Sequence, residues 1–133
     1  MAVASLVVAS CSSSTGGQTP PIVEVGMREY SFDYHAPTQR GRVVFHMVNR
    51  GRLAHRLALV PLAEDFPPIR DQLQGTQRRF ITEVAGIPDR PPGSDGTFAA
   101  DLKPGRYAFI CFSTDPGGRT HASQGMAAEF RIR

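Results

Sequence analysis

The sequence predicts an all-β fold, a Greek-key β-sandwich of about seven to eight strands with one short helix in an insertion over residues 62–92. Thirteen glycines and eleven prolines in 133 residues indicate many short elements joined by turns. Between these turns lie short runs rich in β-branched and aromatic residues, the composition of strands. The chain length fits a single domain, and an apolar content of 41% is ordinary for a globular protein.

The strand-like runs can be placed along the chain by their composition and alternation. In order they cover residues 22–25 continued by 30–34, then 42–48, 55–60, 80–84, 97–102, 106–112 and 127–132. The first strand is interrupted, with Gly26 as a possible bulge. In the third, His55 alternates with its neighbours on the same side as Leu57 and Leu59, so His55 is expected to face the core.

The connections are predicted from proline and glycine. Residues 67–74 are expected to form the short helix, with Pro68 near its first turn and Gly75 after its end. Residues 87–96 are rich in proline and glycine and are expected to form a loop. A turn at 103–105 precedes 106–112, the most strand-like run of the chain.

The first residues predict export. Residues 2–9 are apolar but too few to cross a bilayer, which needs about 20, so residues 1–10 fit a signal peptide. The sequence Val8-Ala9-Ser10-Cys11 resembles the lipobox of bacterial lipoproteins, which implies a lipid on Cys11 and a flexible tether over 11–21. The domain then covers 22–133. Because no Lys or Arg lies between Met1 and Cys11, a buried first strand with an incidental cysteine is the alternative.

The charge distribution argues against a nucleic-acid partner. The formal net charge of +3 comes almost wholly from arginine, since Lys103 is the only lysine, and these arginines are scattered along the chain. Nucleic-acid binding requires a basic stripe with aromatic or helical readout. No Ser-His-Asp or paired-carboxylate arrangement stands out either, so we expect no enzyme.

Cys111 constrains the function most. If Cys11 is lipidated, Cys111 has no disulfide partner, and a lone thiol in an oxidising compartment is prone to oxidation. Cys111 is then either a buried inert residue or a metal ligand. It shares one segment between two strands with His121 and Met126, and two imidazoles, a thiolate and a long axial thioether are the ligands of a blue-copper site. His55 qualifies as the second imidazole.

These residues resemble those of the cupredoxin family, the blue-copper proteins. The resemblance rests on residues 41–51 followed by His55, and on residues 104–111 followed by His121 and Gly125-Met126. It looks closest to small cupredoxin-like lipoproteins of bacteria. It implies one copper ion bound by ring nitrogens of His55 and His121 and by the Cys111 thiolate, with Met126 as a weak axial ligand.

The resemblance also implies one-electron transfer at an extracytoplasmic membrane surface, in the periplasm or on the outer face, with a transient redox partner protein. An exposed edge of His121 is the expected electron port, and the protein is expected to be a monomer. Nine residues separate Cys111 from His121, more than in plastocyanin-like loops, and residues 115–118 are expected to absorb the extra length as a tight turn.

The remaining candidates have simpler interpretations. His46 is expected to point outward from its strand, His35 to lie exposed in a loop, and Met27 and Met47 to fill the core. With four histidines in all, the chain lacks the extra histidine-rich centre of multicopper oxidases. Two alternatives to electron transfer stay open: a periplasmic copper carrier or sensor, and a metal-free cupredoxin-like domain that acts as an interaction module.

Overall fold

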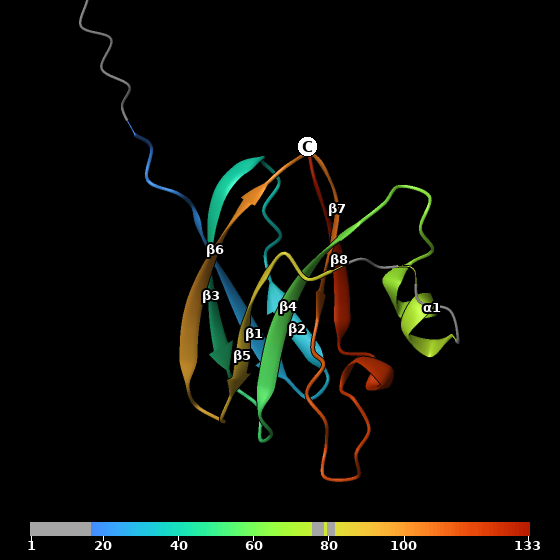
Figure 1. Ribbon diagram of the computed structural model, residues 1–133. Coiled ribbons are helices and arrows are strands. Elements are labelled where there is room, and N and C mark those ends of the chain that lie inside the picture. Colours follow the sequence, from blue (N-terminus) through green and yellow to red (C-terminus); the bar gives the residue numbers. More distant parts are fainter. Residues whose placement is uncertain (1–16, 76–78, 80–81) are drawn as a thin grey trace, which may run out of the picture.

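Two four-stranded sheets pack face to face in the computed structural model, which describes residues 17–75, 79 and 82–133 (Figure 1). The elements are β1 (Ile22–Arg28), β2 (Ser31–Tyr34), β3 (Gly41–Asn49), β4 (His55–Leu62), α1 (Ile69–Gln74), β5 (Ala85–Arg90), β6 (Asp95–Leu102), β7 (Gly105–Ile110), the 3-10 helix η1 (Ala122–Gln124) and β8 (Ala127–Ile132). The first sheet has the order β2-β1-β3-β6 and the second β5-β4-β7-β8. The predicted β-sandwich with one short helix is therefore confirmed.

The interrupted first strand of the prediction is in fact two strands. β1 ends at Arg28, the Glu29-Tyr30 turn reverses the chain, and β2 pairs antiparallel with β1 while β1 pairs parallel with β3. Gly26 keeps a regular register with both neighbouring strands, so the suggested bulge there is wrong. The irregular pairing lies in β4 instead, between His55 and Leu57 where they face β5.

The loop predicted over residues 87–96 is also wrong at both ends, since β5 covers its first residues and β6 begins at Asp95. Residues Ala85–Arg90 form β5, with Ile87 buried against the core. β5 lies at the edge of its sheet, and an edge strand tolerates Pro88 because the missing N–H faces away from the ladder. The strand predicted at 80–84 is not found in residues 82–84, and residues 80 and 81 lie outside the described part.

The core between the sheets leads directly to the candidate site. Its buried members include Phe109, whose ring contacts those of Phe45 and Phe130, and it continues to Cys111 and Met126. A second cluster lies under α1, on the outer face of β4 and β7. Within the described residues, no helix is long and apolar enough to span a membrane.

Candidate metal centre

Of the four residues singled out from the sequence, one lies in a strand of the second sheet and three lie in the segment between two other strands of that sheet. His55 opens β4, Cys111 directly follows β7, His121 precedes η1, and Met126 directly precedes β8. β4, β7 and β8 are antiparallel neighbours, so the start of β4 lies beside the end of β7 and the start of β8. The sheet therefore gathers these residues at one end of the sandwich. Figure 1 shows that end at the bottom of the view, below β4 and β7.

Three donor atoms converge there. The Nδ1 atoms of His55 and His121 are 3.0 Å apart, and the Cys111 Sγ lies 3.8 Å from the first and 3.5 Å from the second. All three residues are fully buried. A metal ion bound at about 2.0 Å by nitrogen and about 2.3 Å by sulfur in one plane separates its donor atoms by roughly 3.5 Å. The observed spacing therefore fits a single ion held by these three side chains.

The protonation states suit the imidazoles as ligands. Burial lowers the pKa of His55, against the opposing effect of a nearby carboxylate, and burial also lowers the pKa of His121, which the neighbouring His55 lowers further. Both rings are therefore neutral near pH 7 and each has a free nitrogen lone pair. Burial raises the pKa of the Cys111 thiol, opposed by hydrogen bonds with Ser113 and the backbone of Arg56. A bound cation reverses that balance, because a coordinating thiol is deprotonated.

Backbone hydrogen bonds close the 111–126 segment on itself. The Cys111 N–H donates to the Met126 carbonyl at 3.1 Å, and the Met126 N–H donates to the His121 carbonyl at 3.0 Å. The Cys111 carbonyl accepts from Ala122 at 2.8 Å, and the Ser113 carbonyl accepts from His121 at 2.8 Å. Met126 is fully buried in the same core cluster as Cys111. The backbone thus ties the positions of Cys111, His121 and Met126 together.

The long loop between Cys111 and His121 is folded into a small hairpin. Thr114 and Thr120 form an isolated antiparallel bridge. Beyond it the Gly118 N–H donates to the Asp115 carbonyl at 2.9 Å, and Gly118 has a φ of 82°, which favours glycine. The tight turn predicted at 115–118 is confirmed, and it carries the extra length away from the site.

A carboxylate that the sequence does not predict lies beside His55. Glu29, in the turn between β1 and β2, lies with its Oε1 3.0 Å from His55 Nε2, and the same oxygen accepts from the N–H groups of Arg52 and Leu53 at 2.8 Å each. Burial opposes the ionisation of Glu29, but the hydrogen bonds from Leu53 and Arg52 outweigh it and hold the pKa of this carboxyl at about 2. No local pattern in the sequence signals this contact, because it joins two turns.

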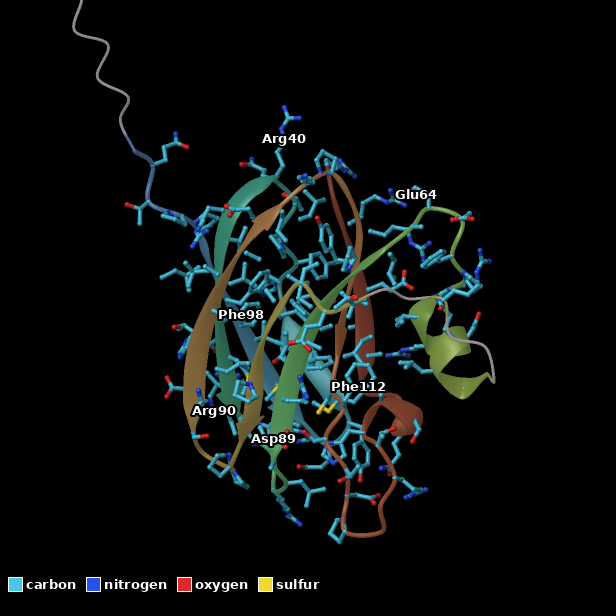
Figure 2. The ribbon with its side chains drawn as sticks, in the orientation of Figure 1. Arg40, Glu64, Asp89, Arg90, Phe98 and Phe112 are labelled. Carbon is cyan, nitrogen blue, oxygen red and sulfur yellow. The ribbon has the colours of Figure 1, made fainter. Side chains whose placement is uncertain are left out.

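Asn49 and Asp89 also support the site from outside the donor set. The Asn49 side chain is buried and donates to the Leu53 and Arg90 carbonyls at 2.9 and 2.8 Å, which ties the loop before His55 to β5. The Ser113 hydroxyl donates to Asp89 at 2.5 Å. Asp89 and Arg90 lie at the metal-centre end of the sandwich, far from Arg40 at the other end (Figure 2).

The expected exposed edge of His121 is absent. His121 is fully buried, and its Nε2 has no hydrogen-bond partner among the described residues. The ring of Tyr30 packs on it edge to face, with centroids 5.1 Å apart. The sequence could not reveal this cover, because Tyr30 belongs to a turn that was predicted as part of a strand.

The other histidines and the core methionines lie as expected. The His46 side chain is 30% exposed and its Nε2 lies 2.7 Å from an Asp95 carboxylate oxygen, so it points away from the core. His35 is exposed. Met27 and Met47 are fully buried in the core between the sheets. Cys11, the predicted lipidation site, lies outside the described residues.

Comparison with known proteins shows the fold class. No protein-family model matches the chain, and no curated protein matches it in sequence. Among solved structures, auracyanin from Roseiflexus castenholzii is 18% identical over 88% of this chain and 99% of its own, with a TM-score of 0.59. Auracyanin B is 19% identical over 87% and 91%, with a TM-score of 0.61. Rusticyanin from Thiobacillus ferrooxidans, a copper protein, is 17% identical over 84% and 77%, with a TM-score of 0.55. The chain thus has the fold of the cupredoxins auracyanin and rusticyanin.

Proposed function

We propose that this protein is a type 1 copper protein that transfers single electrons. The observation that carries the proposal is the convergence of two neutral imidazole nitrogens and one thiol at 3.0 to 3.8 Å in a fully buried site. Thiolate and imidazole ligands in one plane with a weak axial thioether select copper and its blue form. His55, Cys111 and His121 would hold the copper, and Met126 would be its weak fourth ligand. The fold shared with auracyanin and rusticyanin supports the same assignment.

Electron transfer places simple demands on these side chains. Copper supplies a one-electron couple between Cu(I) and Cu(II) when it is bound. The hydrogen-bonded 111–126 segment holds Cys111 and His121 in position, and β4 holds His55, so these side chains would move little between the two oxidation states of a bound copper. The surrounding apolar core excludes water from the site. These residues therefore keep the reorganisation that accompanies each electron transfer small.

The buried ligands favour an electron carrier over the alternatives. A copper carrier or sensor exchanges its metal and needs ligands that another protein can reach, whereas His55, Cys111 and His121 are all fully buried. A metal-free interaction module does not explain why three polar groups are buried against one another, because burying such groups costs free energy. A catalytic metal site keeps an open coordination position for substrate, and the burial of this site argues against one.

We also propose that the protein is exported and anchored to the membrane by a lipid on Cys11. The lipobox-like sequence before Cys11 supports this assignment. Residues 17–21 leave the domain at the end of the sandwich opposite the metal centre (Figure 1). A tether attached there directs the metal centre away from the membrane and toward a soluble redox partner.

The absorption spectrum of the copper-loaded protein tests the central proposal. Reconstitution with Cu(II) should produce an intense visible band from thiolate-to-copper charge transfer, and the band should vanish on reduction. Cys111→Ser should abolish it. A band that survives this substitution, or the lack of any band in the wild-type protein with bound Cu(II), contradicts a type 1 site at these residues.

A further inference from the structure

The turn between β1 and β2 places a carboxylate directly behind a proposed metal ligand. Glu29 Oε1 lies 3.0 Å from the Nε2 of His55, the ring nitrogen that faces away from Cys111 and His121. The Glu29 side chain is 26% exposed, whereas His55 is fully buried. The carboxylate therefore joins the donor cluster to the solvent-facing rim of the protein.

The surrounding backbone is built to receive this carboxylate. The N–H groups of Arg52 and Leu53 both point at Glu29 Oε1. Gly51 leaves the necessary space, since a Cβ at that position would lie 2.5 Å from Glu29 Oε1 and 2.8 Å from His55 Nε2. Asn49 holds the same loop by accepting from the Gly51 N–H at 2.9 Å. Several independent contacts thus converge on the single oxygen that faces His55.

Hydrogen-bond chemistry then decides the tautomer of His55. An ionised carboxylate is only an acceptor, so Nε2 must carry the proton that it donates to Glu29. Nδ1 of His55 is consequently unprotonated and aimed at His121 and Cys111. In the metal-free protein, the 3.0 Å contact between the two Nδ1 atoms then requires the proton of His121 to sit on its Nδ1. His121 Nε2 is then unprotonated, and it has no hydrogen-bond partner among the described residues.

We propose that Glu29 is the positioning residue of the metal centre: it fixes His55 with Nδ1 free for the metal and lowers the reduction potential of the bound copper. This inference rests on the proposed electron-transfer function. A carboxylate behind a ligating imidazole fixes the ring and raises the basicity of the coordinating nitrogen. Its negative charge favours Cu(II) over Cu(I), because the oxidised ion carries the larger positive charge.

Replacement of the charge alone measures the effect on the potential. Glu29→Gln keeps the size of the side chain and an oxygen that accepts from Arg52, Leu53 and His55. It converts a charge-assisted hydrogen bond into a neutral one, a difference on the order of a tenfold equilibrium constant. We expect the ratio of Cu(I) to Cu(II) at a given applied potential to rise about tenfold, a shift of about 59 mV for one electron. Glu24→Gln, which removes an exposed carboxylate from β1, is the matched control.

Nitrogen-15 NMR of the metal-free protein tests the tautomer separately. The wild-type protein and Glu29→Gln should both show His55 protonated at Nε2, and Glu29→Ala should lose this single tautomer. A wild-type His55 protonated at Nδ1 would overturn the positioning role. A potential that is unchanged in Glu29→Gln, or that shifts equally in Glu24→Gln, would overturn the effect on copper. Failure of the protein to bind copper, with the tautomers as expected, contradicts the proposed function but supports the positioning role of Glu29.

Discussion

The Nδ1 atoms of His55 and His121 lie 3.0 Å apart although 66 positions separate the two residues in the chain. This contact depends on the antiparallel sheet, which brings the start of β4 beside the segment that follows β7. It also depends on the backbone bonds that close that segment. The cluster is fully buried, and His121 Nε2 has no hydrogen-bond partner among the described residues, which costs the metal-free protein free energy.

Copper should therefore stabilise the fold. A ligand that binds only the native state at 100 times its dissociation constant adds about 2.7 kcal/mol to the free energy of unfolding. For a domain of this size we expect the melting temperature to rise by about 10 °C. Differential scanning calorimetry of metal-free and Cu(II)-loaded protein measures the difference. Cys111→Ser should show little or none of it, and an equal rise in that variant would mean that copper binds elsewhere.

Met126 should tune the potential without being required for binding. Met126→Leu replaces a fully buried side chain by one of similar volume, so the loss of stability should stay below about 1.5 kcal/mol. The loss of an axial thioether removes electron density that stabilises Cu(II), so the reduction potential should rise while copper stays bound. Voltammetry and metal analysis measure both quantities. Met47→Leu, in the core, is the control, and loss of copper from Met126→Leu would contradict an axial role.

Gly51 offers a second way to disturb the contact between Glu29 and His55. In Gly51→Ala the new Cβ lies in the space of the carboxylate and of His55 Nε2, so the carboxylate should move away from the ring. We expect the reduction potential of copper to rise, as in Glu29→Gln. Gly17→Ala is the control, since a Cβ at Gly17 meets nothing within 4 Å. Gly93→Ala is unsuitable because Gly93 has a φ of 79°, a conformation that strains residues other than glycine.

The convergence of His55, Cys111 and His121 could be predicted from the sequence, whereas its surroundings could not. Strand alternation places His55 on the side of Leu57 and Leu59, and the structure confirms that this side is buried. Cysteine and histidine are metal-binding residue types, so Cys111 and His121 are recognised as candidate ligands from the sequence alone. The contacts of Glu29 and Tyr30 with the two histidines arise from a turn that meets the other sheet, and neither residue type nor spacing encodes such a contact. The proline and glycine content of residues 87–96 predicts a loop, whereas the structure has β5 there, an edge strand that accepts proline.

Tyr30 should control access to His121. Its ring contacts the His121 ring at a centroid distance of 5.1 Å and contributes to its burial. Tyr30→Ala should uncover the imidazole edge and speed electron exchange with a small inorganic complex severalfold, and removal of the aromatic pair should cost about 1 kcal/mol of stability. Stopped-flow absorbance measures the rate. Tyr30→Phe keeps the ring and should behave as the wild type. Equal rates in all three proteins would mean that electrons leave by another route.

Asp115 should make the stability of the ligand loop depend on pH. The Arg119 N–H donates to its carboxylate at 3.0 Å, and the Gln124 side chain donates at 2.9 Å. The hydrogen bond from Arg119 contributes most to lowering the pKa of Asp115. Burial opposes this shift, and the hydrogen bond from the Gln124 side chain lowers the pKa further. Because the folded-state pKa lies below the unfolded one, this stabilisation is present above the ordinary carboxyl pKa and is lost as the pH falls through the lowered value. Asp115→Asn should therefore melt at a lower temperature than the wild type at pH 7, with the difference shrinking at acidic pH. A difference that stays constant between pH 7 and pH 2 would show that the charge of Asp115 contributes nothing to the fold of this loop.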